Sequence, residues 1–296
     1  MIVVTGATGK TGSEIVRLLS AKGVRVRALV RDPARMKRGA GPGVEVVTAD
    51  LAKPLSLDPV FRGADKIYLV SSPEPEQAAF HGNAIDSAKR AGVKQVVRQS
   101  AIGASASSTN GLLRMHGEAD DRLSRSGLSF TILRPNSFYQ NTLAYAASVA
   151  ESGVIRAAMK DAKASMVDCR DVAAAATAVL TSETHSGRIY DLTGPRAIGF
   201  DEVATILGKA IGKPVRYEDV PTEAAREAFI ANGLSAWLAD GLLDLYAAWL
   251  TGRYAEVTEF HERITGKPPR PYEDFAKDFA TVFRGRAEQV EANSGR

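Results

Sequence analysis

The chain opens with MIVVTGATGKTG (residues 1–12), and this stretch decides the fold. Its first five residues form a short apolar run typical of a buried β-strand, and residues 11–22 have the amphipathic pattern of a helix. Between them, Gly6 permits a tight turn off the strand, Gly9 lets backbone amides approach a phosphate, and Gly12 lets the helix pack closely on the sheet. A helix N-terminus adds unpaired N–H groups and a partial positive charge, so the stretch predicts a loop that binds the pyrophosphate of a dinucleotide.

The same loop contains a sequence that is typical of nucleoside triphosphatases. Gly9-Lys10-Thr11 resembles the end of their phosphate-binding loop, but that loop needs a glycine five positions earlier, where this chain has Val4. The spacing excludes the triphosphatase interpretation. We therefore assign the polar loop residues to dinucleotide binding together with the glycines; they are Thr8, Lys10 and Thr11.

The first half of the chain alternates β-rich runs with helical stretches. Strands are expected at 2–5, 24–30, 44–48, 66–70, 93–99 and 129–133, and helices at 11–22, 55–61, 76–91 and 112–126. The runs are dense in Val, Ile and Leu without strict polar alternation, as expected where helices cover both faces of a parallel sheet. The pattern predicts an α/β fold with a Rossmann-like, doubly wound parallel sheet.

The second half of the chain has a looser pattern. Helices are expected at 170–181, 201–211, 223–231, 236–250 and 272–283, and short strands at 189–192 and 215–220. We expect an NAD(P)-binding domain over residues 1–150 with a soft boundary. A smaller, mostly helical α+β substrate lobe over 151–284 should be interleaved with it, and the polar tail 285–296 should be disordered.

Composition narrows the function classes. The 38 Lys and Arg residues are scattered among 34 acidic residues without a run of like charges, so no nucleic-acid partner is expected. No apolar run approaches the ~20 residues of a membrane span, so no membrane association is expected. The single cysteine, Cys169, excludes an intrachain disulfide and suits the cytoplasm. The four histidines lack metal-ligand spacing, so no metal site is expected.

The residue after the second expected strand bears on the choice between NAD(H) and NADP(H). An acidic residue there would bind both ribose hydroxyls, whereas an arginine would pair with a 2′-phosphate. Arg31 occupies this position, and its planar guanidinium suits a phosphate. NADP(H) is therefore favoured over NAD(H). The alternative is a surface ion pair between Arg31 and Asp32.

Five motifs together resemble the NmrA-like family of atypical short-chain dehydrogenase/reductases. They are GATGKTG (6–12), VRDP (30–33), ADL (49–51), LRPN (133–136) and VDCRDVA (167–173). The resemblance extends over nearly the whole chain. It implies a relative of the NADPH-dependent quinone, azo-dye and triphenylmethane-dye reductases, or of redox-sensing regulators with little or no catalysis.

The resemblance also implies site residues just beyond the carboxyl ends of the strands, where open α/β sheets bind ligands. For the cofactor they are Asp50, Leu51, Ser71, Ser72, Pro73, Ser100, Ala101, Pro135 and Asn136, and for the substrate Phe138 and Tyr139. The run 71–73 has a plain alternative as a turn cluster.

A standard catalytic pair of short-chain dehydrogenases is absent from the sequence. None of the eight tyrosines has Lys at the fourth position after it. Instead, His116 and Asp120 lie four apart on one expected helix, so His116 is a candidate proton donor that Asp120 orients, with Tyr139 near the substrate. The alternative is an ordinary ion pair of helix neighbours.

Two functions remain open. The first is an NADPH-dependent oxidoreductase that reduces a small conjugated acceptor, a quinone or dye-like compound, by direct hydride transfer, because such an acceptor disperses charge and depends less on a dedicated acid. The second is a non-catalytic NADP(H)-sensing protein that acts through protein partners. The sequence leaves monomer and homodimer open.

Overall fold

The computed structural model describes residues 1–36 and 41–285, which form two compact units. Each unit is assembled from separate segments of the chain. Unit 1 comprises Met1–Pro135, Cys169–Leu192 and Phe260–Lys267; unit 2 comprises Asn136–Asp168, Thr193–Glu259 and the described residues from Pro268 onward.

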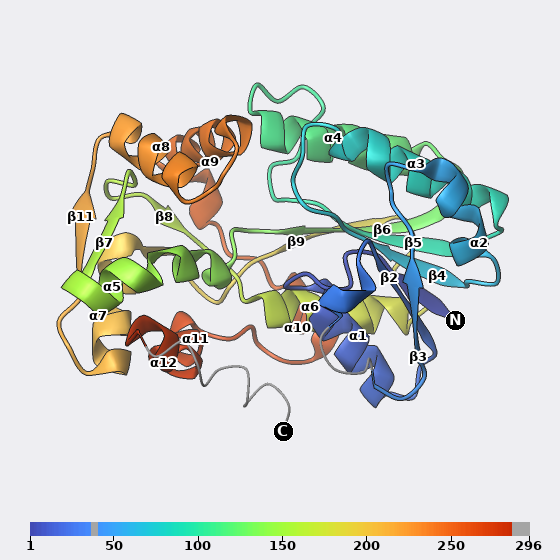
Figure 1. Cartoon of the computed structure of the whole chain (residues 1–296), viewed down its shortest axis with the longest axis horizontal. Helices are drawn as coiled ribbons and strands as arrows, with labels where there is room; N and C mark the ends of the chain where they lie inside the picture. Colours follow the sequence, from blue (N-terminus) through green and yellow to red (C-terminus); the bar gives the residue numbers. More distant parts are fainter. Residues whose placement is uncertain (37–40, 286–296) are drawn as a thin grey trace. The chain divides into compact units, whose positions relative to one another are not determined.

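Unit 1 is built on one seven-stranded sheet in which every neighbouring pair is parallel (Figure 1). Its strands in spatial order are β3 (Val44–Thr48), β2 (Val26–Val30), β1 (Ile2–Val4), β4 (Lys66–Leu69), β5 (Gln95–Gln99), β6 (Ser129–Pro135) and β9 (Arg188–Leu192). The strand order reverses at β1, which lies between β2 and β4. The predicted Rossmann-like sheet is confirmed, and its ligand-binding switch point is at the carboxyl end of β1.

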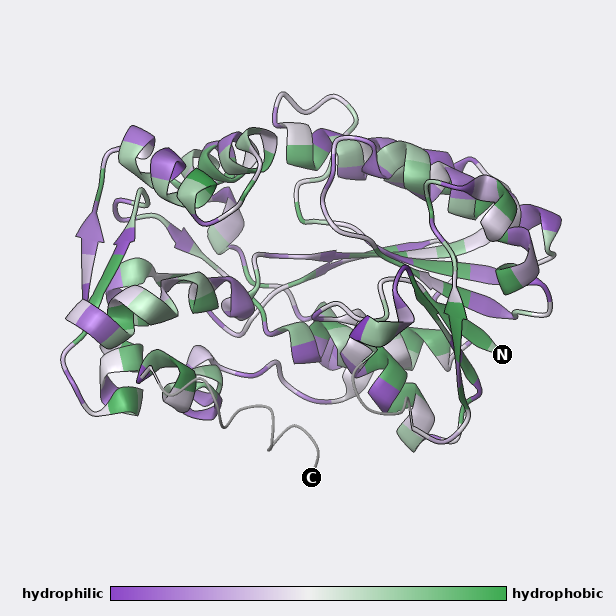
Figure 2. Ribbon diagram, viewed as in Figure 1, coloured by the Kyte–Doolittle hydropathy of each residue, from purple (hydrophilic) through white to green (hydrophobic). Residues whose placement is uncertain are grey.

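Helices cover both faces of this sheet (Figure 1). On one face lie α3 (Gln77–Arg90) and α4 (Gly111–Ser124), and on the other α1 (Gly12–Ala21), α6 (Cys169–Leu180) and α10 (Phe260–Thr265). The short helix α2 (Asp58–Phe61) packs against α3. In Figure 2 the strand that begins at the N-terminus is coloured as hydrophobic along its length, as the burial of both its faces requires.

The core of unit 1 contains aliphatic and aromatic side chains from the strands and from α2 and α3. Phe61 is fully buried, and Ile67, Ile85 and Val96 are each 1% exposed. Burial of each such side chain contributes about 1.5–3 kcal/mol. This apolar layer fixes the strands whose carboxyl ends carry the predicted site.

Three elements beyond residue 150 belong to unit 1: β9, α6 and α10. β9 pairs with β6 in register, Thr131 opposite Arg188, and so extends the sheet by one strand. Helix α6 packs on α1. These later segments therefore extend the sheet beyond β6 and cover one of its faces, while the domain boundaries expected from the sequence stay a prediction.

Unit 2 contains mostly helices with two small sheets. β7 (Val154–Ala157) pairs with β11 (Arg216–Asp219), and β8 (Lys163–Ala164) pairs with β10 (Ile198–Gly199). Its helices are η3 (Tyr139–Tyr145), α5 (Ala146–Ser152), α7 (Phe200–Ile211), α8 (Thr222–Ala231), α9 (Ala236–Trp249), η4 (Arg253–Ala255), α11 (Tyr272–Asp278) and α12 (Ala280–Phe283). The helix expected over 272–283 is thus interrupted at Phe279. The tail prediction concerns residues 285–296, of which all but Gly285 lie outside the described residues.

Candidate functional site

The glycine loop is anchored by Thr5, the residue that directly follows β1. The side-chain oxygen of Thr5 donates to the carbonyl of Val70 at 2.7 Å and accepts from its N–H at 2.8 Å, which ties the carboxyl ends of β1 and β4 together. Gly6 follows with φ +56°, and a Cβ there would lie 2.8 Å from Val70 Cγ1. Only glycine satisfies both the backbone angle and the space, so Gly6 has the role expected of it.

The other two glycines of the loop differ from each other. A Cβ on Gly12 would lie 2.2 Å from the carbonyl oxygen of Gly6, so Gly12 allows the first turn of α1 to pack against the glycine loop. The sequence predicts instead that Gly12 packs against the sheet. A Cβ on Gly9 would have only Gly6 O within 4 Å, at 3.2 Å. The space beside Gly9 is therefore open at the N-terminus of α1, which fits the close approach of a pyrophosphate.

Arg31 and its neighbour Asp32 do not pair. The Asp32 carboxylate accepts from Ala34 N at 3.0 Å and caps the short 3-10 helix η1 (Pro33–Arg35). Arg31 directly follows β2, its side chain is 63% exposed, and its charged partner is Glu74, 4.0 Å away. Because an exposed pair contributes only about 0–1 kcal/mol, the guanidinium can exchange Glu74 for a phosphate at little cost.

The residues predicted after β3 hold the turn in which they lie. Asp50 accepts from Ala52 N at 3.0 Å. Leu51 is 8% exposed and belongs to the unit 1 core, while its carbonyl accepts from Asn83 Nδ2 at 2.9 Å. Both therefore fix the backbone at this edge of the sheet, and their contact with a cofactor stays a prediction.

A buried polar network lies beneath the loops that follow β4 and β5, with Arg98 of β5 at its centre. The Arg98 side chain is fully buried, and three of its nitrogens have partners. Nε donates to His81 Nδ1 at 3.0 Å, Nη2 to His116 Nδ1 at 3.2 Å, and Nη1 to an Asp120 carboxylate oxygen. The network thus joins α3, α4 and β5 through one charged side chain.

Asp120 is the anion of this network. It is 2% exposed. Its second oxygen accepts from Ser100 Oγ at 2.8 Å and from Arg134 Nη2 at 2.8 Å. The predicted contact with His116 is wrong, because two guanidinium groups supply stronger, charge-assisted hydrogen bonds than a neutral imidazole can. Arg98 lies between the two residues and bonds to both.

The electrostatics of the network disfavour a charged histidine. Burial lowers the pKa of His116 well below its usual 6.5, and the charges of Arg98 and Arg134 lower it further. Burial also lowers the pKa of His81, again with help from Arg98. Both imidazoles are therefore neutral near pH 7. The role predicted for His116 is therefore narrower than that of an acid. Its neutral ring can donate a hydrogen bond from an N–H group, but it does not transfer the proton.

The loop after β4 connects to the same network. His81 Nε2 lies 3.1 Å from Ser71 Oγ, and Gln77 Nε2 donates to the Ser72 carbonyl at 3.0 Å. Pro73 is exposed in this loop. Across the next strands, Ile102 N donates to the Pro135 carbonyl at 3.0 Å, which fixes the half-buried turn that begins at Ala101.

The predicted residues of unit 2 are engaged in its interior. Tyr139 is 1% exposed, stacks edge-on against Tyr272 with ring centroids 5.0 Å apart, and donates from its hydroxyl to the Arg270 carbonyl. Asn136 is 3% exposed, and its amide nitrogen donates to Ser165 Oγ at 3.0 Å. These placements favour structural roles for Tyr139 and Asn136. Phe138 is half-buried at the start of η3.

Within unit 1, the network brings together four predicted residues: Ser71 after β4, Ser100 after β5, and His116 and Asp120 of α4. Sequence reasoning missed the residues that join them, Arg98, His81 and Arg134. One signal was available in QVVRQ (95–99), because a charged residue inside an otherwise buried strand requires a buried partner.

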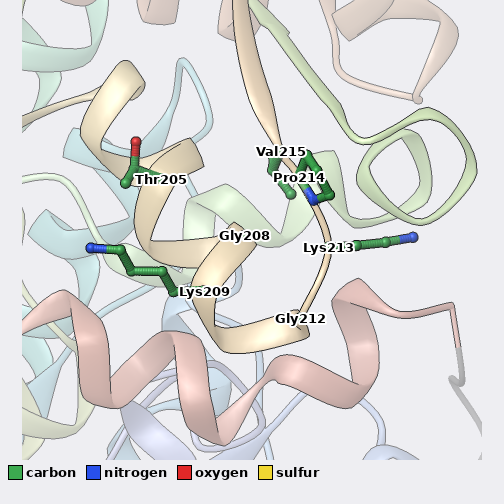
Figure 3. Close-up of a pocket in the computed structure, with 7 residues that line it drawn as sticks. All are labelled: Thr205, Gly208, Lys209, Gly212, Lys213, Pro214 and Val215. Carbon is green, nitrogen blue, oxygen red and sulfur yellow. The ribbon is translucent and has the colours of Figure 1, made fainter.

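A shallow hollow lies on unit 2, where α7 ends and the chain turns toward β11 (Figure 3). Its lining residues are Thr205, Gly208, Lys209, Gly212, Lys213, Pro214 and Val215. The two lysines point away from each other in Figure 3, and Lys213 donates to the Ala150 carbonyl at 2.8 Å. They do not converge on one anion, and the hollow contains no predicted site residue.

Residues 1–36 and 41–285, which the structure describes, contain neither a metal-binding cluster nor a membrane-spanning helix. No group of three or more His, Cys, Asp and Glu side chains there could hold a metal ion. No helix in that part of the chain combines the length and the apolar character needed to cross a membrane. Cys169 is buried at the start of α6, which favours packing over redox chemistry.

Comparisons with known proteins agree with this geometry. A family model described as NAD(P)H-binding matches residues 6–183. The NAD(P)H azoreductase of Xenophilus azovorans is 37% identical over 283 residues, which cover 96% of this chain and 99% of the azoreductase.

Two solved structures have the same fold. The NADPH-dependent quinone oxidoreductase of Escherichia coli, complexed with NADPH, aligns with a TM-score of 0.84 at 32% identity, covering 93% of this chain and 98% of that one. The triphenylmethane reductase of Citrobacter sp., complexed with NADP(H), aligns with a TM-score of 0.81 at 27% identity, with the same coverage of 93% and 98%.

Proposed function

Because this chain belongs to the NAD(P)H-binding family and is an NmrA-like atypical short-chain dehydrogenase/reductase, we propose that it is an NADPH-dependent reductase of quinones or dye-like compounds. Its relatives include an azoreductase, a quinone oxidoreductase and a triphenylmethane reductase. These acceptors are small, conjugated and able to disperse an added negative charge or to lose a positive one. The acceptor of this protein belongs to the same chemical class.

The observation that carries the proposal is the pairing of an open glycine loop with an exposed arginine at the switch point of the sheet. Gly6 and Gly12 have no room for a side chain, while the space beside Gly9 is open. Arg31 follows the adjacent strand, and its charged partner among the described residues, Glu74, is exposed. Such a site holds a pyrophosphate at the helix N-terminus and a 2′-phosphate at Arg31, so NADP(H) fits better than NAD(H).

The remaining residues orient the ligand and stabilise charge. The loop residues Thr8, Lys10 and Thr11 lie beside the phosphates. Ser71 and Ser72 border the adenosine and the pyrophosphate, and Ser100 and Ala101 approach the nicotinamide ribose. When bound, NADPH supplies a hydride to the acceptor. His116 contributes a neutral N–H that can donate a hydrogen bond to the acceptor as negative charge develops on it. Asp120 acts through Arg98 and not on the acceptor.

The alternative, a non-catalytic NADP(H) sensor, is not favoured, because three relatives that are 33–37% identical over at least 90% of the chain are named reductases or an oxidoreductase. A cytoplasmic location and a monomeric or homodimeric state remain predictions. Size-exclusion chromatography with light scattering would test the oligomeric state.

The decisive experiment measures the steady-state oxidation of NADPH with a benzoquinone, an azo dye and a triphenylmethane dye, each also with NADH. We expect NADPH to be consumed with at least one acceptor and to be preferred over NADH. A parallel binding titration separates the alternatives. If the protein binds NADPH but consumes it with none of the three, the sensor function replaces the reductase.

A further inference from the structure

Arg98 fixes the positions of protons on both of its histidine partners. A guanidinium group has only donors, so every atom that bonds to it must offer a lone pair. The partner atom is Nδ1 in His81, at 3.0 Å, and Nδ1 in His116, at 3.2 Å. Each neutral imidazole therefore carries its proton on Nε2.

The same logic gives the chain of hydrogen bonds on the His81 side a direction. His81 Nε2–H donates to Ser71 Oγ at 3.1 Å, and the Ser71 hydroxyl then donates to the Ser72 carbonyl at 3.2 Å. Three consecutive bonds thus point outward from Arg98 to the loop after β4. This loop is the one expected to border the adenosine and the pyrophosphate.

On the other side, the Nε2–H of His116 is left available. In the described part of the chain, no residue bonds to this atom, and His116 as a residue is partly exposed. The charged and titratable groups that face His116 are Arg98 of β5, Arg134 of β6, Asp120 of its own helix α4 and His81 of α3. Asp120 is shared between both arginines and Ser100, so it does not favour an imidazolium.

We propose that Arg98 is a positioning residue whose buried guanidinium locks His81 and His116 as neutral Nε2–H tautomers. His116 then presents an uncharged donor to the acceptor, and no proton is transferred from it. The tautomer assignment concerns the protein alone. The role of His116 toward the acceptor rests on the proposed function.

The tautomers are measurable without turnover. Long-range ¹H–¹⁵N spectra of the protein labelled at its histidine nitrogens distinguish Nε2–H, Nδ1–H and doubly protonated rings, and His81→Gln and His116→Gln variants assign the signals. We expect both rings to show the Nε2–H pattern without titration between pH 5.5 and 8. An Nδ1–H pattern, or titration of either ring near 6.5, overturns the proposal.

Substitution of Arg98 tests its positioning role. Arg98→Lys keeps the charge but not the planar fork, so one ammonium cannot hold both Nδ1 atoms and Asp120 together. We expect at least one of the two rings to show mixed tautomers in this variant while its circular dichroism stays native. If both rings keep a pure Nε2–H pattern, Arg98 does not set them. If the variant does not fold, the spectra of the unmodified protein still decide the assignment.

A matched pair of variants tests the donor on His116. Gln places an N–H₂ group near the position of Nε2, whereas Asn reaches only to the position of Nδ1. We expect His116→Asn to lower kcat/KM by about tenfold, the worth of one hydrogen bond, and His116→Gln to stay within about threefold. His185→Gln, a histidine outside the network, is the control. Equal losses in both His116 variants contradict the donor role.

The pH profile separates a donor from an acid. With a neutral donor, kcat/KM for a quinone does not follow a group near pH 6.5, whereas an imidazolium acid would lose activity as pH rises through its pKa. A fall of that kind overturns the proposal. Inactivity with every acceptor would overturn the proposed function instead, and the spectra would still decide the tautomers.

Discussion

At the scale of single residues, two neighbours show how position decides a role. Arg31 and Asp32 are adjacent and oppositely charged, yet they make separate contacts. Asp32 turns back to cap η1, since its side chain can reach the amide of Ala34 two residues later. The guanidinium of Arg31, on a longer stem, is left at the carboxyl end of β2, where a cofactor phosphate would be bound.

Arg31→Ala should weaken the binding of NADPH by about 1–3 kcal/mol, the value of a charge-assisted hydrogen bond, with little change for NADH. Fluorescence titration of both cofactors measures the effect. Arg25→Ala is the matched control, because Arg25 is also exposed but precedes β2, at the opposite end of that strand. Equal losses for NADPH and NADH would show that Arg31 does not contact the 2′-phosphate.

Gly9→Val and Gly12→Ala should separate binding from folding. The new side chain at Gly9 would occupy the open space, so we expect loss of both cofactors with native circular dichroism. The Cβ at Gly12 would collide with the Gly6 carbonyl at 2.2 Å, so we expect lower stability as well, by about 1–3 kcal/mol in urea unfolding. Wild-type affinity in a folded Gly9→Val protein would mean that the phosphates bind elsewhere.

At the scale of elements, α4 supplies polar residues to the site and also packs tightly against a neighbouring loop. Its N-terminus is capped by Asn110, whose side chain accepts from Leu113 N at 3.1 Å. One turn later it carries His116, and the next residue, Gly117, lies against the loop that follows β5. A Cβ on Gly117 would be 2.1 Å from Ser105 C. This contact sets the distance between the helix and that loop.

Gly117→Ala should therefore displace the loop and destabilise the protein. The collision is with backbone atoms that cannot rotate away, so we expect a loss of about 1–3 kcal/mol in the free energy of unfolding. Urea denaturation measures it, with Glu118→Ala, an exposed site on the same helix, as the control expected to stay within about 0.5 kcal/mol. An unchanged midpoint for Gly117→Ala would show that the helix and the loop can separate at no cost.

The elements also show which features were predictable. The glycine loop, and the strand and helix on either side of it, depend on residues within about one βα unit, so periodicity and glycine spacing were sufficient. The Arg98 network depends on residues from α3, α4, β5 and β6 that meet only after the sheet has formed. A four-residue spacing suggested a His116–Asp120 contact, but it could not reveal that Arg98 enters between them.

At the scale of the whole molecule, completion of the sheet links distant parts of the sequence. β9 pairs with β6 and α6 covers a sheet face, so residues near 170–190 are needed for a unit that begins at residue 1. Local sequence patterns identify such segments as a strand and a helix, but not the sheet to which they belong. For that reason the sequence predicts only a soft boundary near residue 150 and an interleaved second lobe, without naming the segments that cross it.

The two buried histidines should make the stability of the whole protein depend on pH. Burial lowers the pKa of both His81 and His116 in the folded state, so below pH 6.5 the unfolded chain binds more protons than the folded one. Stability is then lost as pH falls, by about 1.4 kcal/mol per histidine at pH 5.5. Urea unfolding at pH 7.5 and 5.5 measures the loss.

His116→Gln removes one of the two groups, so its loss between pH 7.5 and 5.5 should be smaller than that of the unmodified protein by about 1.4 kcal/mol. Identical slopes in the two proteins would mean that His116 titrates normally in the folded state.

The choice of acceptor is the property to which all these features contribute. No tyrosine is followed by Lys at the fourth position, Tyr139 is buried with its hydroxyl bonded, and His116 is neutral. Reduction of a simple ketone leaves a localised alkoxide that needs a proton at once, and acid catalysis there is worth about 10²–10⁴-fold. A quinone or a cationic dye has no such need.

We therefore expect kcat/KM for a cyclic ketone to be at least about 100-fold below that for a quinone of similar size. Steady-state NADPH oxidation with both compounds gives the ratio, and the Gly9→Val protein gives the background that does not depend on the cofactor site. Comparable rates with the ketone would require an acid that this arrangement of residues does not contain, and would contradict the assignment of His116 as a neutral donor.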